Sequence, residues 1–345
     1  ILYGFEASVT EFLAMRLSTA AFIALAVRTA GLRVILDTDL GDDIDDTWAL
    51  SALLQSPSVE LRLIVADSRG SMRHAQAVAR FLEMAGRSAQ VPKIAIGPER
   101  KGSIIMDTWA NSTDLEHFPG KLRYDAAEAI IEEVEAAVKD KVPLHLLVLS
   151  PAFAVAAALQ QAPWISNYTQ ITAMGGSLWH GINGTGPPVA EWNVRADLPS
   201  SRTVYPHVST LGPLDVAGAA QIDGLYFQEL LQCQEHSQVV KALLEMYSAW
   251  LPRCPWTGPR HGPKGPADTR LRSSVVYDLA ATTMLPVFSN DFMTLRRVKV
   301  ALDTNGFTVP MASGWPMLAG INWQNLPGWE RYVVQLLCNK AEVIV

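Results

Sequence analysis

RVILDTDLGDDIDDTWAL, residues 33–50, contains three different kinds of segment in succession. Residues 33–36 form a short apolar run typical of a buried strand, and residues 47–55 have the composition of a buried helix. Between them, six aspartates fall within the ten residues 37–46. The stretch therefore predicts a strand, an acidic loop and a helix.

The same alternation continues along the chain. Apolar runs at 61–66, 93–97, 144–150 and 169–176 predict strands, and helical patterns occupy 72–86, 126–140, 152–161 and 274–285. This order favours a parallel sheet with helices on both faces. We predict that residues 31–345 form one α/β domain with a single open, mainly parallel, doubly wound sheet of the Rossmann-like type. Its ligand crevice is expected at loops that follow strands.

The composition argues against several classes of protein. Charged residues make up 18% of the 345 residues, and 28 Lys+Arg against 34 Asp+Glu give a net charge of -6. A nucleic-acid-binding protein needs a basic face that displaces phosphate counterions, so no nucleic-acid partner is expected.

Residues 1–30 are predicted to be an N-terminal segment outside the domain. From Met15, a positive charge and an apolar run have the outline of a secretory signal peptide, and an amphipathic helix packed on the domain is the alternative. The apolar run, 17–27, is shorter than the about 20 residues of a membrane-spanning helix, so no membrane anchor is expected. Secreted and cytoplasmic locations both stay open, with secretion preferred.

The three cysteines are Cys233, Cys254 and Cys338. They are too few for a disulfide framework and lack the paired spacing of a zinc site. Cys233 and Cys254 could pair in an oxidising compartment, and three buried thiols are the alternative.

The aspartates at 37–46 need a compensating charge. Neighbouring carboxylates raise one another's pKa values unless a cation lies among them, and a helix dipole stabilises only one or two, by about 0.3 to 1 kcal/mol each. Oxygen ligands on a flexible loop favour Ca²⁺ over Mg²⁺. A calcium site is therefore predicted, with a solvated acidic loop as the alternative. An Mg²⁺-dependent phosphatase, which also has Asp-x-Asp after a strand, is a minor alternative.

Residues 34–50 resemble the N-terminal signature of the nucleoside hydrolases, calcium-dependent enzymes that cleave the N-glycosidic bond of ribonucleosides. Four further segments are similar to family segments in the same order: LLVLSPAFAVAAAL (146–159), MGGSL (174–178), AEWNVRADLPSS (190–201) and VYDLAA (276–281). The resemblance spans about residues 33–285 and implies the nucleoside hydrolase fold, a nucleoside as the small-molecule partner, and a homodimer or homotetramer.

The resemblance also implies a set of calcium ligands. Asp39, Asp46, Asp278 and the backbone carbonyl of Phe153 match the family's ligand positions. The acidic signature is two residues longer than the shorter family form, which leaves Asp43 as a further candidate ligand. Asp39 is implied to be the general base that takes a proton from a calcium-activated water.

The remaining positions implied by the resemblance face the sugar. Asp45 and Asn193 would hold the ribose 2′ and 3′ hydroxyls, which suits a carboxylate and an amide. Glu191 and Asn183 would hold the 5′ end, and Trp192 would also contact the substrate.

The leaving-group position differs from that of many family members. These carry a histidine acid immediately before the last calcium aspartate, where this chain has Tyr277. One purine-preferring branch has an aromatic residue there, so the resemblance implies that Tyr277 stacks on a purine, with Trp109 or Trp179 as a second face. His180 is an alternative acid. A nucleoside-binding pseudoenzyme without efficient catalysis is the alternative to the hydrolase.

Overall fold

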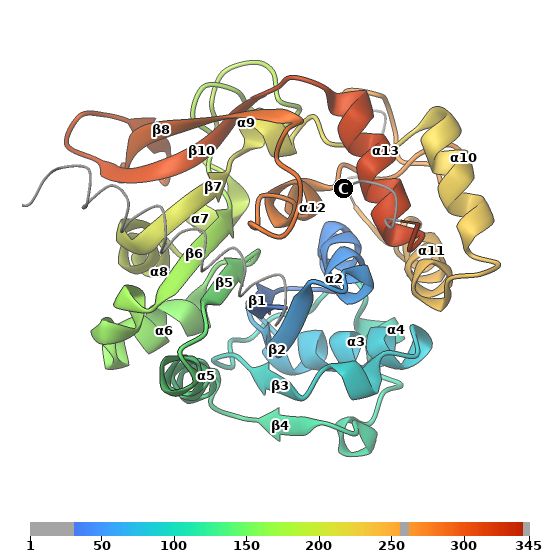
Figure 1. Cartoon of the computed structure of the whole chain (residues 1–345), viewed down its shortest axis with the longest axis horizontal. Coiled ribbons are helices and arrows are strands. Elements are labelled where there is room, and N and C mark those ends of the chain that lie inside the picture. Colours follow the sequence, from blue (N-terminus) through green and yellow to red (C-terminus); the bar gives the residue numbers. More distant parts are fainter. Residues whose placement is uncertain (1–30, 256–261, 341–345) are drawn as a thin grey trace, which may run out of the picture.

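The computed structural model describes residues 31–255 and 262–340, in which ten strands form one sheet of order β4-β3-β2-β1-β5-β6-β7-β10-β8-β9 (Figure 1). The strands are β1 (Leu32–Thr38), β2 (Val59–Ala66), β3 (Lys93–Ile96), β4 (Lys121–Arg123), β5 (Leu144–Val148), β6 (Thr169–Met174), β7 (Val208–Gly212), β8 (Met293–Leu302), β9 (Thr308–Pro310) and β10 (Trp315–Trp323). Neighbouring strands from β4 through β10 pair in parallel, whereas β10–β8 and β8–β9 pair antiparallel. The predicted open, mainly parallel α/β sheet is confirmed, and the antiparallel extension is a feature that the sequence patterns did not predict.

Helices cover both faces of the sheet. They are α2 (Asp45–Gln55), α3 (Ser71–Met84), α4 (Asp107–Ala110), α5 (Ala126–Asp140), α6 (Phe153–Gln161), α7 (Trp192–Ala196), α8 (Leu198–Val204), α9 (Leu214–Ala217), α10 (Gly224–Cys233), α11 (Gln238–Trp250), α12 (Tyr277–Thr282) and α13 (Leu326–Leu337). Short 3-10 helices occupy Ser88–Gln90, Leu115–His117, Pro163–Asn167 and Tyr205–His207. One face carries α5, α6 and α8, and the other carries α2, α3 and α10 to α13 (Figure 1).

Helix α2 is the central helix of the second face. All of its side chains are buried, because it packs against α11, α12 and α13 as well as the sheet. A helix enclosed on every side needs apolar residues all round, which explains Trp48, Leu50 and Leu53. Its first turn carries Asp45 and Asp46, whose charges the positive end of the helix dipole favours.

The helix expected at 274–285 is shorter in the structure. Helix α12 begins at Tyr277 because the residues before it are extended and pair with another segment: the amides of Ser273 and Val276 donate to the carbonyls of Ile222 and Ala220 at 2.9 and 2.8 Å. This pairing places Asp278 in the first turn of α12, beside α2.

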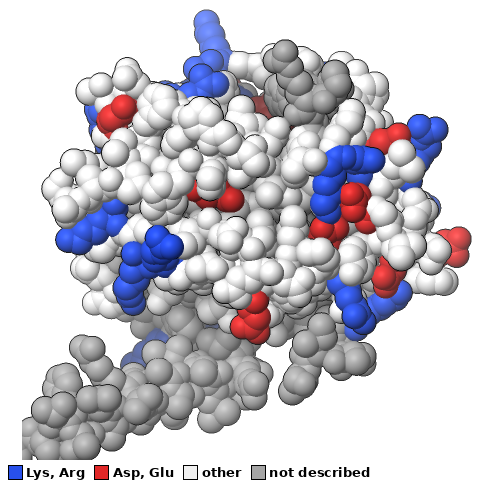
Figure 2. Space-filling model, turned by 90° about the horizontal axis from the view of Figure 1, so that it is seen from above, with Lys and Arg blue, Asp and Glu red and all other residues white. Residues whose placement is uncertain are grey.

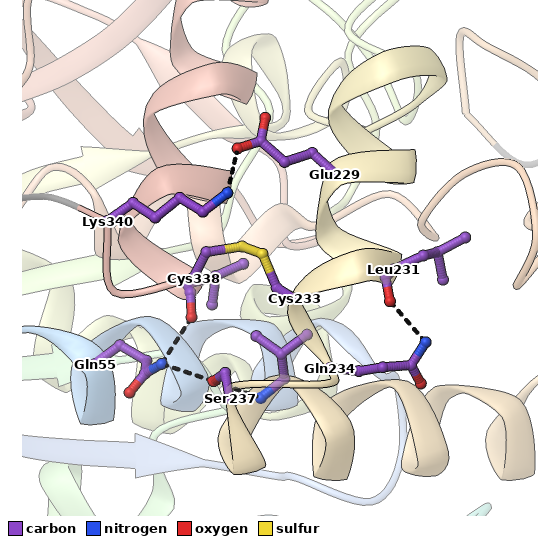
Figure 3. Close-up of a disulfide and its surroundings, with 10 residues drawn as sticks. Gln55, Glu229, Leu231, Cys233, Gln234, Ser237, Cys338 and Lys340 are labelled. Atoms are coloured by element: carbon purple, nitrogen blue, oxygen red, sulfur yellow. Dashed lines mark hydrogen bonds and ion pairs between the residues drawn. A yellow bond between two sulfur atoms is a disulfide. The ribbon is translucent and has the colours of Figure 1, made fainter.

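A disulfide joins the ends of two helices (Figure 3). Cys233 at the end of α10 is bonded to Cys338 just after α13, with Cα atoms 5.6 Å apart. The expected pairing of Cys233 with Cys254 is therefore wrong, as is the alternative of three thiols; Cys254 is buried outside the bridge. Sequence proximity was misleading because α13 returns to α10 from 105 residues away.

Three further observations concern the surface and the termini. Within residues 31–255 and 262–340, no helix is both long and apolar enough to cross a membrane. On the face in Figure 2, acidic and basic side chains form small separate groups among uncharged residues. The predicted signal peptide falls within residues 1–30 and lies outside the described residues.

Candidate active site

A cavity of about 720 Å³ lies beyond the carboxyl ends of the central strands. This is where an open α/β sheet is expected to bind its ligand. Its walls come from the segments that follow β1, β5, β6 and β7, from α7 and from α12. They are formed by Asp39, Asp42, Asp43, Asp45, Asp46, Ile105, Leu149, Met174, Ile182, Val189, Ala190, Glu191, Trp192, Asn193, Arg195, Leu214, Tyr277 and Asp278.

Three carboxylates from two helices meet in this cavity. Asp45, Asp46 and Asp278 each offer an oxygen, and these oxygens lie within 4.8 Å of one another. The packing of α12 on α2 brings them together: the amide of Asp278 donates to Asp45 Oδ2 at 3.3 Å. The Thr38 hydroxyl at the end of β1 donates to Asp46 Oδ1 and orients that carboxylate. The three groups form an all-oxygen donor set of the kind that hard divalent cations select.

The electrostatics of the cluster call for a cation. Burial raises the pKa of Asp46 well above its usual value, and the neighbouring Asp45 carboxylate raises it further. Burial is also the main cause for Asp278, followed again by the charge of Asp45. Because each negative charge disfavours the next, the ionised cluster is stable only with positive charge among the carboxylates.

Asp39 lies beside this group. It lines the cavity, and burial followed by the charge of Asp46 raises its pKa well above the usual value. It is not one of the three carboxylates whose oxygens converge most closely. Phe153, the predicted carbonyl ligand, is the first residue of α6 and does not line the cavity; its ring packs under the Arg100 guanidinium at 4.0 Å.

Asn193 and Glu191 both line the cavity, but they are held differently. Asn193 Nδ2 donates to the Leu149 carbonyl at 2.9 Å, which fixes the amide and leaves its oxygen as the group available to a ligand. Glu191 caps α7: its carboxylate accepts from the amides of Asn193, Val194 and Gly176 at 2.8, 3.2 and 3.0 Å. Sequence reasoning missed this capping role, although Glu191 immediately precedes a helix.

Of the predicted aromatic residues, Tyr277 and Trp192 line the cavity, whereas Trp109 and Trp179 do not. Tyr277 lines it at the start of α12, and burial raises the pKa of its phenol, so the hydroxyl stays protonated. Trp192 lies at the mouth with 56% of its surface exposed, and the Arg195 guanidinium covers its ring at 5.0 Å. Trp109, one of the two candidates for a second base-stacking face, is only 8% exposed and packs in the core of α3 and α4 beneath Arg80, away from the cavity wall.

The other candidates lie in the loop after β6. Asn183 does not line the cavity, and its Oδ1 is buried without a hydrogen-bond partner in the described part of the chain. Trp179 is 39% exposed, with the Arg296 guanidinium 5.9 Å above its ring. His180 is exposed and does not line the cavity.

The structure also adds residues that sequence reasoning did not single out. Arg195 supplies a positive charge to the cavity wall, while Ile182, Met174 and Leu149 supply apolar surface. Arg195 and Leu149 both fall within segments quoted above for the resemblance, and their neighbours Asn193 and Ser150 could have directed attention to them.

Solved structures with the same fold are numerous and distant in sequence. A purine-preferring ribonucleoside hydrolase from Gardnerella vaginalis matches with a TM-score of 0.68 and 20% identity, over 90% of this chain and 100% of its own. A plant nucleoside hydrolase matches with a TM-score of 0.67 and 17% identity, over 89% and 99%. The inosine-uridine preferring nucleoside hydrolase from Bacillus anthracis matches with a TM-score of 0.62 and 17% identity, over 90% and 100%.

At these identities the matches establish the fold alone, and no curated protein matches the chain. The family itself is established by the sequence. The family model described as inosine-uridine preferring nucleoside hydrolase matches residues 34–326, which is most of the chain and includes the candidate site. The chain belongs to the inosine-uridine preferring nucleoside hydrolase family.

Proposed function

We propose that this protein hydrolyses the N-glycosidic bond of ribonucleosides in a calcium-dependent reaction, releasing the free base and ribose, with a preference for purines. The observation that carries the proposal is the convergence of Asp45, Asp46 and Asp278 in the cavity that Asn193 and Tyr277 also line. A metal-binding corner beside an amide and an aromatic ring suits a polar sugar attached to a flat base.

The donor set fits calcium. Asp39, Asp46 and Asp278 would hold the ion; all three are carboxylates, as a hard cation requires, and their raised pKa values would fall on binding. The bound ion supplies Lewis acidity that lowers the pKa of an adjacent water. The Phe153 carbonyl is retained as a proposed further ligand.

The residues around the metal corner have separate tasks in this proposal. Asp39 receives the proton of the attacking water, because it is a buried carboxylate at the edge of the cluster. Asp45 and the Asn193 oxygen accept hydrogen bonds from the ribose 2′ and 3′ hydroxyls, which fixes the sugar with its anomeric carbon toward the water. Glu191 and Asn183 are proposed for the 5′ end, Glu191 by holding the backbone of α7 in place.

Departure of the base depends on the aromatic and apolar residues of the cavity wall. Tyr277 is proposed to stack on a purine, and its neutral hydroxyl is a hydrogen-bond donor rather than a strong acid. Trp192 and the apolar side chain of Ile182 would cover the base at the mouth. A large flat purine gains more from this contact than a pyrimidine, which is the reason for the proposed preference.

A nucleoside panel tests the proposal. Inosine, adenosine and uridine are incubated with the protein in Ca²⁺ and, in parallel, in chelator, and free base and reducing sugar are measured. Release that needs Ca²⁺ and is faster for the purine nucleosides is expected. Equal release in chelator would contradict the metal dependence, and faster uridine cleavage would contradict the purine preference. Phosphate release from a generic ester with Mg²⁺ would instead support the phosphatase.

Binding without turnover is the second candidate function. It is favoured by Tyr277, because a phenol of raised pKa is a poor acid for a leaving base. A type III effector protein complexed with adenosine diphosphate ribose shares the fold with a TM-score of 0.62 at 15% identity. Calorimetric binding of inosine without release of ribose would establish this alternative.

We also propose that the protein is secreted, on the basis of the signal-peptide outline that begins at Met15, and that it forms a homo-oligomer, as the family resemblance implies. The Cys233–Cys338 bridge supports secretion, since such bonds persist in oxidising compartments. Cell fractionation tests the location, and light scattering of the purified protein tests the oligomer.

A further inference from the structure

Two carboxyl groups that the proposed reaction does not use lie beneath the cavity. Asp37 is the next-to-last residue of β1, and Asp67 follows β2; both are completely buried. The two carboxyl groups are neighbours: burial raises the pKa of Asp37 well above its usual value, and the charge of Asp67 raises it further. Asp37 Oδ2 and Asp67 Oδ1 have no hydrogen-bond partner in the described part of the chain.

The pair is connected to the turn between β5 and α6. The Ser150 hydroxyl donates to Asp37 Oδ1, and the Ala154 amide donates to Asp67 Oδ2 at 2.7 Å. Helix α6 has no side-chain cap of its own, because the N-cap position is Ala152, which has a positive φ of 60°. Asp67 therefore supplies from another strand the cap that the local sequence lacks.

The position of Asp67 is itself closely constrained. Its amide donates to the Thr38 carbonyl at 2.9 Å, and a Cβ on Gly97 at the end of β3 would lie 2.5 Å from its Oδ1. Only glycine at position 97 leaves room for this carboxyl group. The pair thus bridges the carboxyl ends of β1, β2 and β3 and the start of α6.

The turn that is held in this way carries parts of the candidate site. The Leu149 carbonyl accepts from Asn193 Nδ2 at 2.9 Å, and Phe153 supplies the proposed carbonyl ligand. From these contacts we infer that Asp67, through its hydrogen bond from the Ala154 amide, is a positioning residue that holds the 149–154 turn for metal and ribose binding. The effect of Asp67 on metal and ribose binding rests on the proposed function, whereas its contacts with the turn do not.

The test compares two substitutions of one residue. Asp67→Asn keeps an acceptor for the Ala154 amide, whereas Asp67→Ala removes it. Amide hydrogen exchange of the 149–160 segment is measured by mass spectrometry without metal, and Ca²⁺ affinity by calorimetry. Asp67→Ala is expected to speed exchange about tenfold and weaken Ca²⁺ binding about tenfold, and Asp67→Asn to stay near wild type in both.

A matched control separates positioning from general instability. Glu133 is a buried carboxylate on α5, paired with Arg62 at 3.1 Å and not part of the cavity wall. Glu133→Ala is expected to lower the melting temperature without changing exchange at 149–160 or Ca²⁺ affinity. If Asp67→Ala does not fold, Gly97→Ala, which displaces the carboxyl without deleting it, takes its place.

The outcomes are distinguishable. Wild-type exchange in Asp67→Ala, or equal losses in Asp67→Asn and Asp67→Ala, would overturn the positioning role. Absence of Ca²⁺ binding by the wild type would overturn the proposed function, while the exchange data would still decide whether Asp67 holds the turn.

Discussion

Removing the Cys233–Cys338 bridge should lower the stability of the fold without removing any group from the cavity. The cysteines are 105 residues apart. Closing a loop of about 100 residues reduces the chain entropy of the unfolded state, which stabilises the folded state by about 4.7 kcal/mol at 25 °C. Measured effects are commonly about 2 to 4 kcal/mol, which is the decrease we expect in the free energy of unfolding. Part of this decrease in stability should arise beside the bridge. Gln55 Nε2 at the end of α2 donates to the carbonyl of Leu337, the residue before Cys338, at 2.7 Å. It also donates to the Ser237 hydroxyl at 3.0 Å (Figure 3).

The assay is urea unfolding of the wild type and of the Cys233→Ser, Cys338→Ser double variant, each with and without reductant. Reductant should lower the wild-type midpoint to that of the double variant and leave the double variant unchanged. Cys254→Ser, which leaves the bridge intact, is the control and should remain sensitive to reductant. An unreduced wild type no more stable than the double variant would refute the reasoning, and so would peptide mapping that found Cys233 unbridged.

Three further results are expected. Asp39→Asn should lower kcat by about 10² to 10⁴ with little change in the melting temperature, and normal turnover would exclude Asp39 as the base. Asn193→Ala should lower kcat/KM about tenfold or more, mainly through KM, because the ribose loses a fixed acceptor; an unchanged KM would remove it from the sugar site. Burial and neighbouring charges raise the pKa values of Asp46 and Asp278 when the chain folds. The metal-free folded state therefore binds more protons than the unfolded state. Its free energy of unfolding should fall as the pH rises above about 4, the usual pKa of an aspartate. Because Ca²⁺ needs ionised ligands, the increase in melting temperature that it causes should be larger at pH 8 than at pH 5, and a pH-independent increase would count against these ligands.

Strands β1, β2, β3, β5 and β6 of the parallel part could be predicted because their signals are local, whereas β4, β7 and β10 were not predicted. A strand buried on both faces, such as β1 or β5, is almost continuously apolar, and the helix that follows has its own period. The antiparallel strand β8 was missed because its exposed positions and charged residues, among them Arg296 and Arg297, weaken the pattern.

The candidate site divides along similar lines. The resemblance named Asp45, Asp46 and Asp278, and the structure brings them together from two helices. Helix capping and side-chain burial were harder to predict from the sequence. The hydrogen bonds of Glu191 to α7 and the core position of Trp109 depend on how distant segments pack, which no local sequence pattern shows. The disulfide partner of Cys233 depends likewise on the return of α13 to α10.

The contact between Asp45 and Asp278 spans 233 residues of sequence. During synthesis on a ribosome, β1 and α2 emerge early and must wait until α12 has been translated before the third carboxylate arrives. An N-terminal fragment ending before residue 277 would contain the aspartates of the acidic loop but not Asp278, so its metal site would lack one carboxylate. Cleavage of the polypeptide between the two halves should therefore inactivate the protein unless both fragments are combined, so the chain is suited to a split-reporter design in which activity returns only on reassembly.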